Sequence, residues 1–381
     1  MPAKHRSRLR INPKITTPTR FKNLRHHWKT HTMLNSASFL QTKHFHPKDF
    51  FRPLELASLD NTSFTDACFY YRIQGIKCPS SELMLKTLKA YPSSLMEIQV
   101  NQALRQQFEG LPRQIRRYFK RFGVVILDFH RDPYYGKVNN PYITIGQVKD
   151  STRKAYSYLT ADLWTPRGLF TLAVKFRHPG EQVQDLFGDL LAQIELVLSP
   201  KLFLMDGEFA DVMILRDLIR RGIKFIARKS LTARVKPLAW AYELTDNWFE
   251  FRRFHQITLL DKTKKHEVTV HVMFHRVKKK MKALIASPGL DLTVEQTDQT
   301  YRSQFGIETG YRDKHKFQGL TTSKSLSVRL ILFLFAIVFW NLWQAFVILV
   351  FPRKKGSLKR INQWQRQAKP IKRFLTWDEV L

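Results

Sequence analysis

The order of strand-like and helix-like segments between residues 121 and 229 constrains the fold of this chain more than any other feature. Residues 124–127 form a short β-branched apolar run, which is typical of a strand buried on both faces. Two more strands are expected around a turn, and after them helices and strands alternate. The expected elements are strands at 156–164 and 169–176, a helix at 183–198, a strand at 202–205, a helix at 211–221 and a strand at 224–227. This order predicts an α/β fold with one mixed sheet and flanking helices.

The regions on either side of this core follow different patterns. Residues 50–120 are helical in pattern, with one helix expected at 58–73, a break at Gly75 and a second helix that begins near Ser80 and Ser81. Two helices around such a turn are compatible with a helix-turn-helix that binds DNA, although plain helical bundles show the same pattern. Residues 230–298 alternate as strands do and predict a β-rich insertion.

The charge of the chain indicates its class of partner. Lys and Arg number 64 against 31 Asp and Glu, which gives a formal net charge of +33. The first 48 residues contain 11 Lys and Arg and no acid, so residues 1–49 are expected to form a flexible basic arm, and residues 352–381 form a basic C-terminal tail. Nucleic acid is the expected partner, with an anionic membrane surface as the alternative.

Residues 330–351 are nearly all apolar, with Asn341 and Gln344 as the polar interruptions. The length of this segment would cross a bilayer. A core helix covered on several sides is the soluble alternative, and we favour it because no other segment has the character of a membrane protein. Cys68 and Cys78 are the only cysteines, and no secretory signal is visible at the N-terminus. We therefore expect free thiols and a cytoplasmic protein.

Two aspartates stand where predicted strands end. Asp128 follows the strand at 124–127, and Asp206 follows the strand at 202–205. Carboxylates from two strands can share a Mg²⁺ ion, which prefers oxygen ligands and keeps waters for a substrate phosphate. Asp132 remains an alternative for the first position, and Glu208 or Asp211 for the second. His130 has no second ligand at helix spacing, so a zinc site is not expected.

A stretch near the C-terminus resembles a known family. Tyr301 and Glu308 have the separation found in the Tyr–Arg–Glu–Lys signature of insertion-sequence DDE transposases, and Arg302 and Lys314 lie close to the basic positions of that signature. Two positions differ, because Gln304 stands at the Arg position and His315 at the Lys position. The segments around Asp128 and Asp206 are similar to the other two blocks of the family.

The resemblance implies a fold, an activity and a metal. It implies an RNase H-like catalytic core that begins at 121–229 and is completed by residues 299–351, where the helix of Glu308 is followed by an apolar helix packed on the core. The β-rich insertion lies between these parts. Asp128, Asp206 and Glu308 become the expected catalytic carboxylates and ligands of Mg²⁺, with Mn²⁺ expected to substitute. The implied reaction is metal-dependent DNA strand cleavage and strand transfer.

Several side chains near Glu308 are candidates for DNA contacts. These are Tyr301, Arg302, Lys314 and Lys316, for which a solvated charged helix face is the alternative. Trp240 and Trp248 in the insertion are candidates for stacking on a base, although such residues are more often core, and we select Trp248.

The sequence thus predicts a DNA transposase of an insertion sequence, which binds the terminal repeats of its element and target DNA and works as a homodimer on DNA ends. Two other readings stay open at this point: a non-catalytic DNA-binding protein from a decayed element, and an RNase H-like nuclease.

Overall fold

The computed structural model describes residues 44–136, 141–149, 151–166, 168–231, 235–243, 254–261, 263–277, 280–302 and 314–350. The chain forms two compact units, a helical unit made of Met1–Tyr118 with Asp313–Leu381, and a sheet unit made of Phe119–Arg312. The sequence-based division placed 299–351 in one segment, whereas the structure divides this segment near residue 313.

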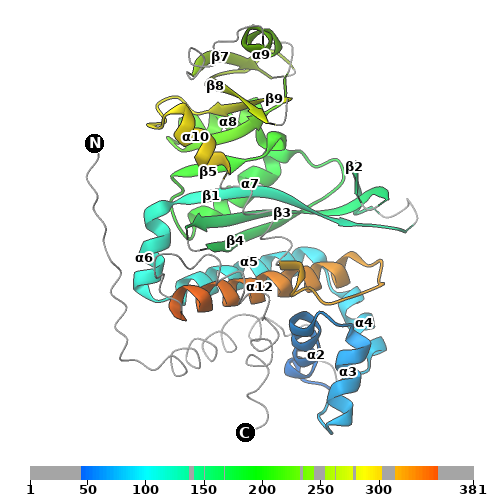
Figure 1. The fold of residues 1–381 in the computed structure, drawn as a ribbon. Coiled ribbons are helices and arrows are strands. Elements are labelled where there is room, and N and C mark those ends of the chain that lie inside the picture. The colour runs from blue at the N-terminus through cyan, green and yellow to red at the C-terminus, as the bar shows by residue number, and fades with distance from the viewer. Residues whose placement is uncertain are drawn as a thin grey trace. The chain divides into compact units, whose positions relative to one another are not determined.

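The sheet unit is built on one mixed sheet (Figure 1), which confirms the predicted α/β class. Within the described residues its strand order is β2-β3-β1-β5-β6-β9-β8-β7, and β4 also pairs with β3. The strands are β1 (Val124–Pro133), β2 (Thr144–Lys149), β3 (Thr152–Thr165), β4 (Gly168–Arg177), β5 (Leu202–Met205), β6 (Lys224–Lys229), β7 (His255–Leu260), β8 (Glu267–Val277) and β9 (Lys280–Ala286).

Both kinds of strand pairing occur in the part of the sheet that was predicted first. β1, β3 and β4 are antiparallel neighbours, whereas β5 is parallel to β1 and β6 is parallel to β5. The parallel strands are joined through α7 (Val183–Glu195) and α8 (Val212–Arg220), because parallel neighbours need a long crossover. Phe187 of α7 contacts Phe203 of β5 at 5.8 Å between ring centroids, so α7 covers the face of the sheet on which Phe203 lies.

The strands after residue 230 continue this same sheet. β9 pairs antiparallel with β6, and β8 and β7 follow it as a meander. The β character expected for 230–298 is therefore present, and this region also contains α9 (Lys236–Glu243). The attachment to β6 was not visible in the sequence, because it depends on pairing between segments about 60 residues apart.

The opposite face of the sheet is covered by α10 (Val294–Arg302). Tyr301 of α10 is buried in one apolar cluster with Ile126, Leu204 and Ile226, which come from three neighbouring strands. Because side chains alternate along a strand, these residues and Phe203 point to opposite faces. This packing places the last turn of α10 over Ile126 of β1, Leu204 of β5 and Ile226 of β6.

The helical unit begins with helices that the sequence predicted only in part. Residues 58–73 were expected to form one helix, but this prediction was wrong: α2 (Pro47–Asp60) ends before Asn61, and α3 (Phe64–Ile73) begins after Ser63. Asn61 has φ of 53°, and the Ser63 hydroxyl accepts a hydrogen bond from the amide of Asp66, so a turn and an N-cap separate the helices.

The next helices follow the sequence more closely. α4 (Ser81–Ala90) is capped by Ser80, as predicted, and its partner helix α3 ends before Gly75, which has φ of 69°. α5 (Ser93–Glu109) and α6 (Arg113–Phe122) follow, and α6 runs across the chain boundary between the two units. Cys68 and Cys78 are both free and buried. A role of α3 and α4 as a helix-turn-helix stays a prediction.

α12 (Leu326–Val350) contains most of the apolar segment and packs against α2, α4 and α5. Sequence reasoning had assigned the catalytic core as its partner, whereas these contacts lie within the helical unit.

α12 is long and apolar enough to cross a membrane over Leu326–Ala345, and 89% of that span is buried in the protein. The Asn341 side chain donates to Gln107 Oε1 at 3.2 Å, and Gln107 donates to the carbonyl of Val338 at 3.2 Å. The buried amide of Asn341 is thus hydrogen-bonded within the helical unit.

Candidate functional site

Asp128 and Asp206 lie side by side on two parallel strands, where β5 ends beside the middle of β1. The first strand was predicted to end at residue 127, but this was wrong, because β1 continues to Pro133 and Asp128 lies within it. The register of β1 and β5 pairs Ile126 with Leu204 and Leu127 with Met205, so Asp128 and Asp206 are the next residues of the two strands. Both side chains are half-buried. Since residues in register on parallel neighbours point to the same face, the two carboxylates share the face covered by α10.

Arg228 occupies the corresponding position on the third strand. β5 and β6 pair Leu204 with Ile226 and Met205 with Ala227, so Arg228 stands beside Asp206 in the same register, and it is exposed. On each of the three strands, a buried aliphatic residue in contact with the Tyr301 cluster is followed two positions later by a charged residue. The strands thus deliver Asp128, Asp206 and Arg228 in a row.

Tyr301 connects α10 to this row. Its side chain is buried, with 7% of the residue exposed. Burial raises the pKa of the Tyr301 hydroxyl well above its usual value. The negative charges of Asp206 and, to a smaller extent, Asp128 raise this pKa further, whereas the positive charge of Arg228 lowers it. Tyr301 is therefore close enough to all three charged groups to experience their fields. The order of these effects makes Asp206 the carboxylate with the largest influence.

The alternative carboxylates for the second position are engaged elsewhere. Glu208 forms ion pairs with Arg131 of β1 and with Arg177 of β4. Asp211 is the N-cap of α8, because its carboxylate accepts a hydrogen bond of 2.9 Å from the amide of Met213. In contrast, no hydrogen bond or ion pair of the Asp206 side chain is found among the described residues. This difference supports Asp206 over both alternatives.

Asp132 is the alternative to Asp128, and the strand geometry separates the two. Asp132 lies four residues further along β1, which corresponds to roughly 13 Å in an extended strand. It is paired with Tyr156 of β3, past the point where β5 ends at Met205. Asp128 is thus the aspartate of β1 that lies next to Asp206.

The other predicted site residues have different outcomes. Glu308 and Trp248 lie outside the described residues. Arg302 is exposed and its guanidinium pairs with Asp298 at 2.7 Å, one turn back along α10.

Lys314 and Lys316 belong to the helical unit rather than the sheet unit, and Lys314 is only 2% exposed, whereas Lys316 is exposed. As placed, Lys314 does not offer its ammonium group to a phosphate in solution. Trp240 of α9 is 55% exposed, with the Lys236 ammonium 4.9 Å from its ring centre.

The donor set of this row suits a hard divalent cation in part. Two carboxylates on adjacent strands supply the oxygen ligands that Mg²⁺ prefers. Within the described part of the chain, no three His, Cys, Asp or Glu side chains gather as a complete metal site. The predicted third ligand, Glu308, follows Tyr301 by seven residues and lies beyond the described end of α10. The described residues therefore provide the two-carboxylate part of such a site.

Sequence reasoning missed two features of this region. It gave no role to Arg228, although the chain shows the same signal there as at the aspartates, namely a charged residue directly after a buried strand. It also treated Glu208 as a candidate ligand and did not foresee its ion pairs with Arg131 and Arg177, which come from strands distant in sequence.

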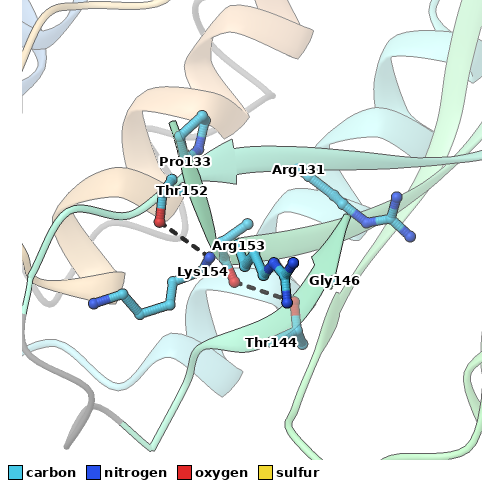
Figure 2. Close-up of a pocket in the computed structure, with 8 residues that line it drawn as sticks. Arg131, Pro133, Thr144, Gly146, Thr152, Arg153 and Lys154 are labelled. Carbon is cyan, nitrogen blue, oxygen red and sulfur yellow. Dashed lines mark hydrogen bonds between the residues drawn. The ribbon is translucent and has the colours of Figure 1, made fainter. Parts of the chain in front are cut away.

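A small pocket lies elsewhere in the sheet unit, beside the ends of β1, β2 and β3 (Figure 2). It is lined by Arg131, Pro133, Thr144, Gly146, Thr152, Arg153, Lys154 and Ala155. Figure 2 shows the Lys154 ammonium pointing away from the guanidinium groups of Arg131 and Arg153. Lys154 donates to the carbonyl of Gly136, and Arg131 pairs with Glu208. The basic groups therefore do not converge on one ligand position, and we assign no activity to this pocket.

In comparisons with known proteins, no family model matches this sequence, and no curated protein matches it.

Proposed function

We propose that this chain is a DNA transposase of the DDE type, which cleaves DNA at the ends of a mobile element and joins the freed ends to target DNA. The observation that carries this proposal is the adjacency of Asp128 and Asp206 beneath Tyr301. Tyr301 begins the segment that resembles the transposase signature, and the third expected carboxylate, Glu308, follows it by seven residues in the sequence. α10, which carries Tyr301, is described as far as Arg302.

The topology supports an RNase H-like core for the proposed enzyme. Three antiparallel strands, β4, β3 and β1, are followed by β5 and β6, which are parallel to β1 and reached through helices. The β7–β9 meander lies in the chain between Asp206 and α10, where the resemblance implies a β-rich insertion. The net charge of +33 supports a polyanionic partner such as DNA.

The chemistry assigned to each residue follows from its position. Asp128 and Asp206, with Glu308, would hold Mg²⁺, which supplies positive charge to the attacking and leaving oxygens of an in-line phosphoryl transfer. Arg228, an exposed cation beside Asp206, is placed to bind a non-bridging oxygen of the scissile phosphate. Tyr301 packs over the row and can orient the carboxylates or donate to a phosphate. Transfer of two DNA ends to one target requires two active sites, so we propose a homodimer on DNA.

The test is a cleavage reaction on linear DNA that carries the gene with both flanks. Full-length protein is incubated with this DNA and Mg²⁺ or Mn²⁺, and each break is mapped, with Asp206→Asn and Asp132→Asn run in parallel. We expect breaks at the two flanks that need the metal, vanish with Asp206→Asn and persist with Asp132→Asn.

Other outcomes would replace the proposal. Tight DNA binding without breaks in either metal would favour a non-catalytic DNA-binding protein from a decayed element. Breaks scattered along the DNA, without joined products, would favour an RNase H-like nuclease. Normal cleavage by Asp206→Asn would show that the site is assigned wrongly.

A further inference from the structure

The turn that follows Asp206 is anchored by ion pairs on the face of the sheet opposite to Tyr301. This turn is the short 3₁₀ helix η2 (Gly207–Phe209), and Glu208 is its middle residue. One Glu208 oxygen pairs with Arg131 of β1, and the other lies 3.7 Å from Nη1 of Arg177 of β4. The three side chains are each about a third exposed, with values of 35% for Glu208, 30% for Arg131 and 27% for Arg177.

Aromatic packing supports the same anchor. The ring of Phe209 stacks on the ring of Phe129, with centroids 5.2 Å apart and an angle of 8° between the planes. The Arg177 guanidinium lies 5.2 Å from the centre of the Phe129 ring, within the range of a cation–π contact. Phe129 directly follows Asp128 in β1. Phe129, which is next to Asp128, therefore packs on Phe209, which is three residues after Asp206.

The backbone of the turn has further hydrogen bonds, one of them from β6, because the Lys229 ammonium donates to the carbonyl of Ala210 at 2.9 Å. Asp206 is extended, with φ of −76° and ψ of 172°, and its carbonyl accepts a hydrogen bond of 3.1 Å from the amide of Phe209. The amide of Ala210 donates to the carbonyl of Gly207 at 3.2 Å. These two bonds fix the shape of the turn but do not tie it to β1, whereas the contacts of Glu208 and Phe209 do.

We propose that Glu208 is a positioning residue, which through Arg131 and Arg177 holds the η2 turn so that the Asp206 carboxylate stays beside Asp128. The inference rests on the proposed function, because the carboxylate pair is proposed to bind a divalent cation. Groups that orient metal ligands typically change metal affinity or activity by about 10–100-fold when removed. Since the Glu208 ion pairs are partly exposed, we expect the lower end of this range.

Binding of Mn²⁺ to the full-length chain without DNA is the first readout, measured by electron paramagnetic resonance of the free ion. Glu208→Ala removes both ion pairs, and Glu208→Gln loses the same charge but keeps an oxygen that accepts from the arginines. Asp217→Asn is the matched control, because Asp217 also pairs with two arginines, at 2.6 Å to Arg220 and 2.8 Å to Arg221.

We expect Glu208→Ala to weaken Mn²⁺ binding by about tenfold, Glu208→Gln by only about twofold, and Asp217→Asn not at all. Equal weakening by Glu208→Ala and Glu208→Gln would overturn the inference, because charge rather than position would then explain the loss. Unchanged binding in Glu208→Ala would overturn it as well. Absence of Mn²⁺ binding in the unsubstituted protein would instead reject the metal site of the proposed function.

Amide hydrogen exchange provides a readout that needs no metal. We expect the peptide that covers residues 203–211 to exchange at least about tenfold faster in Glu208→Ala than in Glu208→Gln, while peptides of α8 stay unchanged. Exchange in 203–211 that is equally slow in both variants would show that the ion pairs do not hold the turn, whatever the protein does with metals.

Discussion

The two faces of the sheet, at the place where β5 ends beside β1, differ in how their charged side chains are arranged. On the α10 face, Asp128 and Asp206 lie together beneath Tyr301. On the other face, one carboxylate, Glu208, is shared by Arg131 and Arg177. Successive residues of one strand belong to different faces, because side chains alternate. Neighbouring positions can therefore serve different purposes, with chemistry proposed on one face and support for it on the other.

Removal of a carboxylate on the α10 face should have the largest effect. We expect Asp206→Asn to reduce metal-dependent cleavage at the flanks of the gene by at least about 100-fold, because a single electrostatic group at a reaction centre commonly contributes this much. Binding of the same DNA, measured by fluorescence anisotropy, should change by less than about twofold, since the basic surface is retained.

The same comparison distinguishes the two aspartates of β1. Asp128→Asn should match Asp206→Asn, whereas Asp132→Asn should keep cleavage within about threefold of the unsubstituted protein, because Asp132 lies beyond the end of β5. If Asp132→Asn abolished cleavage and Asp128→Asn did not, the pairing of the first carboxylate with Asp206 would be rejected.

An intermediate effect is expected from the arginines, and it differs between the faces. Arg228 is exposed beside Asp206, so Arg228→Met should reduce the slope of log binding constant against log salt by about 0.9, the value for one phosphate contact. Arg131 is engaged by Glu208, and Arg131→Met should leave this slope unchanged. Equal slopes for the two variants would contradict the assignment of Arg228 to the phosphate.

The smallest effect concerns the titration of Tyr301. Its pKa is raised by burial and by Asp206, so the folded protein holds this proton more tightly than the unfolded chain, whose tyrosine pKa is about 10. The corresponding stability is present below pH 10 and is lost as pH rises towards the folded-state pKa. Between pH 10 and 12, the free energy of unfolding should fall more steeply than in Tyr301→Phe, by up to about 1.4 kcal/mol per pH unit.

Urea titrations of the two proteins at several pH values provide this measurement. Parallel profiles in Tyr301→Phe and the unsubstituted protein would show that the pKa of Tyr301 is not raised in the folded protein. In Asp206→Asn the difference between the profiles should shrink, since the largest charge that opposes ionisation of Tyr301 has been removed.

Local sequence patterns were sufficient to predict much of the sheet and the pair of aspartates. The run 124–127 and the run 202–205 are short and apolar, and Asp128 and Asp206 follow them directly. The expectation that both residues stand at strand ends was correct for Asp206 only, because β1 continues to Pro133, but the two aspartates do lie beside each other. The capping signal that separates α2 from α3 was overlooked, although it is present in the sequence: Ser63 is the N-cap of α3, and its hydroxyl donates to the Asp66 carboxylate at 2.7 Å.

Contacts between distant segments could not be inferred in this way. β9 pairs with β6, and Glu208 forms ion pairs with Arg131 and Arg177. These contacts depend on the path of the folded chain, so no local sequence period indicates them. The partners of α12 were missed for the same reason, because a helix that is apolar on all sides does not indicate which helices cover it.

The helical unit has a consequence for the time at which the protein becomes complete. Its two parts flank the sheet unit, so roughly 200 residues are synthesised between α5 and the start of the second part. At about 5–20 residues per second, this interval is on the order of 10–40 s. During it, the surfaces of α2, α4 and α5 that later contact α12 lack the cover that α12 provides. Incomplete translation products that end before Leu326 therefore lack a finished helical unit. Complete folding of this unit requires that synthesis has passed α12.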